Sequence, residues 1–302
     1  MTTSAVSPPQ PLPSRPPRRP LPPGACDTHA HVFGPFDRFP LLQSLAYAPP
    51  LGPFEAHDAM LKAVGLTYGV LVHPAAYAFD HSAMLEALAR GGGCLRGIGV
   101  AAPDITDVEL TALHSAGVRG LRFTEIARGS NPPRAAAIPG RVGFDALVAL
   151  APRMRALGWH AVLWAASERI AESADTLLAL GLPLVLDHMG YFETARGVDA
   201  PDFQTVLRLL RDGRVWAKLS VCRHSSDRIA YADVRPFHDA LMAANPERLL
   251  WGSDWPFISL DQSAMNAGHL IDMFDSWTTD ESLRRQVLVS NPAKLYGFGS
   301  NN

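Results

Sequence analysis

Residues 183–190 read PLVLDHMG, and this stretch shows the unit from which the fold is built. An apolar run is followed at once by Asp187 and His188, and Gly190 then allows the chain to turn sharply. A short apolar run that ends in a turn signal is typical of a strand buried on both faces, as in parallel sheets. The stretch therefore predicts a buried strand with polar side chains at its carboxyl end.

The same unit recurs along the chain. Seven further short runs rich in Val, Leu, Ile or Trp lie at residues 25–32, 66–73, 95–101, 117–123, 160–165, 215–220 and 249–254. Between them, apolar residues three and four positions apart predict amphipathic helices at 58–64, 82–89, 109–115, 144–157, 171–180, 203–211 and 234–244. Strand–helix alternation of this kind predicts right-handed crossovers and an α/β fold, a closed (β/α)8 TIM barrel. A doubly wound open sheet is the alternative, but no GxGxxG motif follows an early strand.

The first 24 residues differ in composition from the rest of the 302-residue chain. They hold nine prolines and three arginines, with no acidic residue. We therefore predict two parts: a proline-rich, flexible N-terminal arm at 1–24 and the catalytic barrel domain at 25–302. An arm that docks a partner or wraps around a second subunit is the alternative.

Charge and cysteine content exclude several classes of protein. The formal net charge is −2, so no global field favours nucleic acid or a membrane surface. No apolar run approaches the 18 residues of a membrane-spanning helix. The three cysteines form no close-spaced pair, which predicts reduced thiols and a cytoplasmic location. The sequence leaves open whether the chain forms a homo-oligomer.

Polar and titratable residues gather where the predicted strands end. His29 and His31 end the first run, His188 the sixth and Asp254 the eighth. In TIM barrels, catalytic groups lie at the carboxyl ends of the strands. His29 and His31 also share one face of their strand, because side chains alternate along it. One buried histidine is usually only hydrogen-bonded, but this set of four predicts catalytic residues.

This ordered set resembles the amidohydrolase superfamily. The forms CDTHAHVFG, LDHMG and WGSDWP look most like its 2-pyrone-4,6-dicarboxylate lactonase-like branch (amidohydrolase family 2), over residues 25–298. The resemblance implies a hydrolase that opens a carboxylated lactone, 2-pyrone-4,6-dicarboxylate-like or muconolactone-like, in aromatic compound catabolism. Two alternatives within the superfamily are a sugar-acid lactonase and a zinc-dependent decarboxylase of an unsaturated carboxylic acid. A barrel that only binds an anion is a further alternative, but it would not need Asp254 as a base.

The resemblance also bears on cofactors. Many binuclear members of the superfamily carry a lysine at the end of strand four and a histidine at the end of strand five, where this chain has Arg122 and Trp164. We therefore expect either no cofactor or one divalent metal such as zinc, held by His29, His31, His188 and Asp254. Without a metal, Asp254 would act as the general base on water, and the three histidines would polarise the lactone carbonyl.

The resemblance implies which residues bind the substrate. Arg122 lies at the end of predicted strand four, Arg128 follows it, and Arg223 follows strand seven; the resemblance gives all three the role of holding substrate carboxylates. The planar guanidinium group suits this role because it can bind both carboxylate oxygens. Tyr77 and Trp164 are expected to line the pocket as well. The predicted partner is a small anionic lactone.

Overall fold

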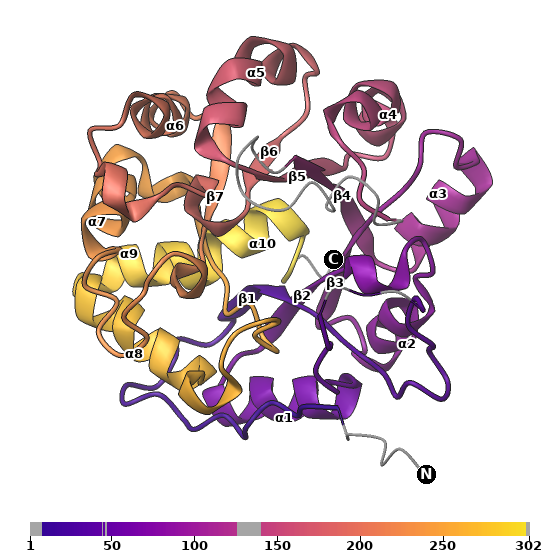
Figure 1. Ribbon diagram of the computed structural model, residues 1–302, viewed down its shortest axis with the longest axis horizontal. Coiled ribbons are helices and arrows are strands. Elements are labelled where there is room, and N and C mark those ends of the chain that lie inside the picture. The colour runs from indigo at the N-terminus through magenta and orange to yellow at the C-terminus, as the bar shows by residue number, and fades with distance from the viewer. Residues whose placement is uncertain (1–7, 44, 46, 126–139, 300–302) are drawn as a thin grey trace, which may run out of the picture.

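The computed structural model describes residues 8–43, 45, 47–125 and 140–299. Its centre is one sheet of eight parallel strands in the order β1 to β8, each paired with the next (Figure 1). The predicted (β/α)8 barrel is confirmed. The strands are β1 (Cys26–Ala30), β2 (Tyr68–Val72), β3 (Leu95–Gly99), β4 (Val118–Glu125), β5 (His160–Ala165), β6 (Leu184–Leu186), β7 (Val215–Leu219) and β8 (Leu249–Trp251).

Contacts just beyond the last strand close the barrel against the first. Ala30 forms a parallel bridge with Trp255. The amide of Asp254 donates to the carbonyl of His29 at 2.8 Å, and the amide of His31 donates to the carbonyl of Trp255 at 2.8 Å. This seam places the end of β1 directly beside the segment that follows β8.

Helices form the outer layer of the barrel (Figure 1). All seven predicted helices are present, each within a few residues of its expected bounds. The helices are α1 (Phe54–Val64), α2 (Ser82–Arg90), α3 (Asp107–Ser115), α4 (Phe144–Ala156), α5 (Ser167–Ala179), α6 (Pro201–Arg211), α7 (Arg235–Ala244), α8 (Ala267–Trp277), α9 (Glu281–Arg285) and α10 (Asn291–Tyr296). The last three, after β8, were not predicted. None of the described helices is long and apolar enough to cross a membrane.

The local sequence explains how such a helix forms and packs. In α6, Pro201 occupies the first turn, where its missing amide hydrogen costs nothing. Phe203, Val206 and Leu210 then fall on one face, and all three are buried against the barrel. The opposite face carries charged residues, so α6 packs against the barrel through its apolar face.

Side chains fill the barrel at the end opposite to the carboxyl ends of the strands. Val70, Ile98, Val162 and Leu250 point inward from four strands and form one buried cluster, which Tyr296 of α10 covers. Layers of branched side chains make the interior of such a barrel a packed core rather than a pore. Among the described residues, this packed layer closes one end of the barrel and leaves the opposite end for a substrate.

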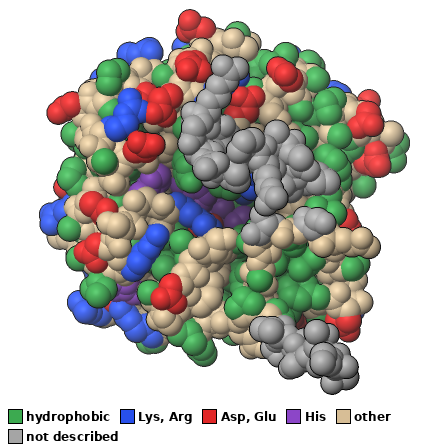
Figure 2. Space-filling model, in the orientation of Figure 1, with side chains coloured by type: hydrophobic (Ala, Val, Ile, Leu, Met, Phe, Trp, Pro, Cys, Tyr) green, Lys and Arg blue, Asp and Glu red, His purple; other side chains and the backbone are tan. Residues whose placement is uncertain are grey.

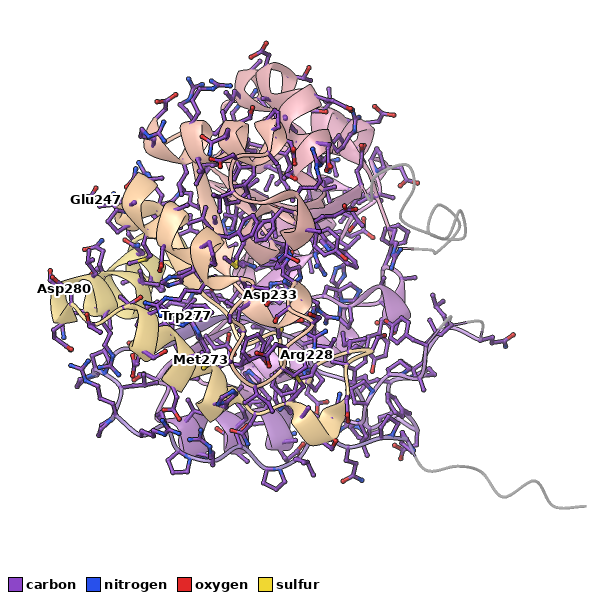
Figure 3. All side chains as sticks on the ribbon, turned by 60° about the vertical axis from the view of Figure 1, so that its left-hand side comes forward. Arg228, Asp233, Glu247, Met273, Trp277 and Asp280 are labelled. Carbon is purple, nitrogen blue, oxygen red and sulfur yellow. The ribbon has the colours of Figure 1, made fainter. Side chains whose placement is uncertain are left out.

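The described part of the proline-rich segment lies along its own barrel. Arg15 forms an ion pair with Asp272 of α8 at 2.6 Å, and the amide of Arg18 donates to the same carboxylate at 2.6 Å. Arg284 of α9 donates to the carbonyl of Pro20 at 3.0 Å. Figure 3 shows this flank, with Met273 and Trp277 on α8. Residues 1–7 of the predicted arm lie outside the described part of the chain.

Candidate active site

A pocket opens at the carboxyl ends of the strands. Figure 2 shows histidine and cationic side chains in the hollow at the centre of this face. Most of its lining comes from strand ends and the loops that follow them, as the barrel fold predicts. The polar and aromatic lining residues are His31, Tyr47, His73, Arg122, Thr124, Arg141, Trp164, His188, Arg223, Asp254 and Ser259.

The structure brings most of the predicted site residues together here. His29 lies just beneath the pocket, fully buried and in contact with Asp254. Tyr77 is not among the lining residues: its ring is buried, and its hydroxyl accepts a hydrogen bond from the amide of Gly34 at 2.7 Å. Arg128 lies outside the described residues.

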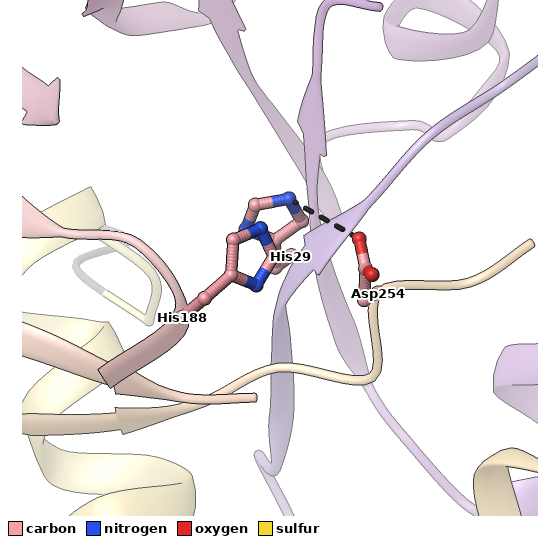
Figure 4. Close-up of side chains that lie close together, drawn as sticks. All are labelled: His29, His188 and Asp254. Atoms are coloured by element: carbon pink, nitrogen blue, oxygen red, sulfur yellow. Dashed lines mark ion pairs between the residues drawn. The ribbon is translucent and has the colours of Figure 1, made fainter. Parts of the chain in front are cut away.

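Three histidines and one carboxylate form the centre of the site. The Oδ1 atom of Asp254 lies 3.6 Å from Nε2 of His29 and 3.5 Å from Nε2 of His31. The rings of His29 and His188 lie 4.8 Å apart. Figure 4 shows His29, His188 and Asp254 converging from three different parts of the barrel. One ligand atom from each of these three lies within 4.8 Å of the others.

The contacts of Nδ1 determine which ring nitrogen of His31 carries the hydrogen, whereas those of His29 are mixed. Nδ1 of His31 lies 2.7 Å from the carbonyl of Val72, which can only accept, so Nδ1 carries the hydrogen. Nδ1 of His29 lies 3.2 Å from a carboxylate oxygen of Asp187, an acceptor, and 3.3 Å from Nζ of Lys218, a donor, so either tautomer of this ring finds a partner at Nδ1. Burial lowers the pKa of His29 to about 3, so the ring is neutral at pH 7. Nε2 of His31 therefore presents a lone pair to the centre of the site.

This donor set fits one divalent cation. His29 Nε2, His188 Nδ1 and Asp254 Oδ1 are buried and have no hydrogen-bond partner among the described residues. Buried polar atoms without partners are costly, and imidazole nitrogens with a carboxylate oxygen are ligands that zinc accepts. A metal ion at this point would satisfy them together.

A buried charge cluster supports His29 from below. Asp187 lies 3.0 Å from Nζ of Lys218 and 2.8 Å from Nε of Arg122. Burial raises the pKa of Asp187, but Lys218, His29 and Arg122 together hold it well below its usual value. The ionised carboxylate then fixes the orientation of the His29 ring. Lys218 was not predicted as a site residue, although it lies near the carboxyl end of β7.

Arg223 engages the same carboxylate that faces the histidines. Its Nε pairs with Oδ2 of Asp254, and its Nη1 donates to the carbonyl of Ile258 at 2.7 Å. Burial raises the pKa of Asp254, but Arg223 and the neighbouring histidines hold it well below its usual value. Asp254 is therefore ionised across the neutral pH range. Its φ of 63° is a left-handed conformation that Asp and Asn tolerate better than most residues.

Arg141 is a pocket residue that the sequence analysis missed. Its guanidinium carbon lies 5.4 Å from the ring centre of Trp164, and that of Arg122 lies 4.5 Å from the same centre. The Trp164 ring thus carries two cationic neighbours. Arg141 belongs to a loop rather than a strand, so no periodicity in the sequence indicates where its side chain points.

A closed parallel barrel with a buried histidine and aspartate cluster at the carboxyl ends of its strands is typical of TIM-barrel enzymes. The family model described as amidohydrolase matches residues 26–298, and the chain belongs to this family.

Several known proteins are similar to this chain over most of their length. A 4-sulfomuconolactone hydrolase of Hydrogenophaga intermedia is 35% identical, over 92% of this chain and 90% of the relative. A 2-pyrone-4,6-dicarboxylate hydrolase of Comamonas testosteroni is 34% identical, over 91% of each chain. The solved structure of a probable 2-pyrone-4,6-dicarboxylic acid hydrolase of Acinetobacter baumannii, with citric acid bound, matches with a TM-score of 0.76 and 26% identity, over 91% of this chain and 100% of that one.

Proposed function

We propose that this enzyme hydrolyses the ring ester of a lactone that carries an anionic substituent, in the catabolism of aromatic compounds. The observation that carries the proposal is a buried, ionised Asp254 that faces a pocket containing Arg122, Arg141 and Arg223. The names of the similar hydrolases, which refer to muconolactone and pyrone dicarboxylate substrates, support the same substrate class. The free cysteines support a cytoplasmic location.

Asp254 is the proposed general base. Its carboxylate would accept a proton from water while the water oxygen attacks the lactone carbonyl. The ring carbon–oxygen bond then breaks, and the proton passes from Asp254 to the leaving oxygen. Water is consumed and one carboxylic acid is formed, so atoms and charge balance.

The histidines take a role set by their hydrogen bonds. Because Nδ1 of His31 donates its hydrogen to the carbonyl of Val72, Nε2 of the neutral ring can accept a hydrogen bond but cannot donate one to the lactone carbonyl. We therefore assign to His31 the task of holding the attacking water. This revises the expectation that His31 polarises the carbonyl by donation, and it leaves Arg122, His29 and His188 as the groups available for that task. A divalent metal held by His29, His31, His188 and Asp254 would supply positive charge for the developing oxyanion.

A lactone panel tests the proposal. The purified enzyme is assayed with 2-pyrone-4,6-dicarboxylate, muconolactone, a sugar-acid lactone and a neutral lactone, each with chelator and with added zinc. We expect turnover of the anionic lactones and at least about 10-fold lower kcat/KM for the neutral one, the effect of losing one charge-assisted hydrogen bond. If no lactone is hydrolysed in any condition, the proposed function is wrong.

A further inference from the structure

Arg141 differs from the other two described arginines of the pocket in having no acidic partner. Arg122 is paired with Asp187, and Arg223 is paired with Asp254. No ion pair or hydrogen bond joins Arg141 to any described residue, and its Nε is buried without a partner. Residues 126–139, which lie outside the description, contain neither Asp nor Glu in the sequence. No carboxylate, either of the described residues or of residues 126–139, therefore neutralises the positive charge of Arg141.

The backbone on both sides of Arg141 is fixed. Gly140 has a φ of 82°, and a Cβ there would lie 2.5 Å from the carbonyl oxygen of Ala78, so only glycine allows this close approach. On the other side, the carbonyl of Val142 accepts a hydrogen bond from the amide of Thr124 at 2.7 Å. These two contacts hold Arg141 at the pocket wall, next to Trp164.

The buried charge of Arg141 beside that of Arg122 is destabilising unless an anion binds between them. Burial lowers the pKa of Arg141, and the positive charge of Arg122 lowers it further. Arg122 and Arg141 both lie against Trp164, so their charges also repel each other. An acidic group bound between them would offset both effects, because a guanidinium group binds carboxylate and other oxyanions through paired hydrogen bonds.

We infer that Arg141 binds a second acidic substituent of the substrate, on the Trp164 side of the pocket, and so makes the enzyme selective for lactones with two anionic groups. Arg223, although paired with Asp254, also lines the pocket, and it lies beside the proposed base, where the ring opens. The two positions would hold the substrate at two points and orient its carbonyl. This inference rests on the proposed function, whose substrate it narrows.

The test compares a diacid with a monoacid. The kcat/KM values of the wild type and Arg141→Met are measured with 2-pyrone-4,6-dicarboxylate and with 2-pyrone-6-carboxylate. We expect the ratio of diacid to monoacid to fall about 10- to 100-fold in the variant, the usual effect of losing a hydrogen bond between charged groups. Arg141→Lys should recover part of the ratio, because it keeps the charge but not the planar fork. An unchanged ratio in Arg141→Met overturns the inference.

A matched control comes from α4. Arg153 pairs with Asp107 on the outer surface, at 2.7 Å. Arg153→Met makes the same type of substitution at a distance from the pocket. The ratio of kcat/KM for the diacid to that for the monoacid should stay at the wild-type value. An equal fall in both variants would show a general effect of arginine loss and would also overturn the inference.

A binding measurement separates the inference from the proposed function. Calorimetry with benzene-1,3-dicarboxylate and benzoate needs no turnover. The wild type should bind the dicarboxylate more tightly, and Arg141→Met should lose that preference. If the wild type shows the preference but hydrolyses no lactone, the proposed function fails alone. If the variant keeps the preference, the Arg141 assignment fails alone.

Discussion

The replacement Asp254→Asn tests the proposed base with little change of shape. Asp254 has a φ of 63°, and Asn is one of the few residues that adopts this conformation readily. The amide keeps the volume of the carboxylate and one acceptor oxygen, while an NH2 donor replaces the other oxygen. Alanine would instead add backbone strain at the same position, so Asn is the cleaner substitution.

Two magnitudes follow from the contacts of Asp254. Loss of a general base lowers turnover by about 10²- to 10⁴-fold. Stability falls as well, because Arg223 loses its carboxylate partner. Removal of one partner from a fully buried ion pair costs about 3–5 kcal/mol. Since Arg223 is 18% exposed and keeps its bond to the carbonyl of Ile258, we expect a smaller loss, about 1–3 kcal/mol.

The assay separates these two effects. Turnover is followed by the loss of lactone absorbance, binding by calorimetry with the diacid probe, and stability by urea unfolding. The expected variant is folded, binds the probe and is nearly inactive. Asp58→Asn on α1, which removes an exposed carboxylate paired with Lys62, should leave all three unchanged. Turnover of Asp254→Asn within about 3-fold of the wild type would remove Asp254 from the role of base, since that role is worth at least about 10²-fold.

Two further predictions concern buried charge. Lys218→Met should lower the free energy of unfolding by about 1–3 kcal/mol, less than for an isolated buried pair, because Asp187 keeps Arg122 and His29; an unchanged urea midpoint would contradict this. Burial lowers the pKa of His57 and His224 to about 4 and that of His160 to about 3. Below pH 6.5 the unfolded chain therefore binds protons that the folded chain does not. Stability should fall between pH 6.5 and 4.5 by up to about 1.4 kcal/mol per pH unit for each histidine, and a flat profile in urea titrations would refute this.

The fold could be predicted because one repeated pattern determines it. Short apolar runs and helical spacing are local signals, and eight repeats leave few topologies. Strand ends were less accurate: the sixth run was expected to extend to residue 189, but β6 ends at Leu186. His188 and Met189 have φ values of 47° and 58°, which no strand accommodates. The end of β8 at Trp251 has a similar cause, the positive φ of Asp254.

The positions of candidate site residues could be predicted only where these residues lie at strand ends. His29 lies near the end of β1, and His31, His188 and Asp254 follow strands, so the parallel sheet itself brings the four together. Arg141 lies in a loop that is positioned by contacts with Ala78 and Thr124, which are far from it in sequence. Tyr77 was expected to line the pocket, and its hydroxyl accepts a hydrogen bond from the amide of Gly34, a contact that the sequence pattern does not indicate. The pairing of Lys218 with Asp187 depends on side-chain reach between strands, which alternation alone does not give.

The closing seam of the barrel has a consequence for biosynthesis. Asp254 and His29 are held together by a backbone hydrogen bond between parts of the chain that are more than two hundred residues apart. A ribosome-bound chain that has not yet released the segment after β8 possesses the histidines but neither the carboxylate nor the closed barrel. With Asp254 as the proposed base, we expect hydrolytic activity to begin only when the segment after β8 docks, so an activity assay during synthesis would report completion of the fold.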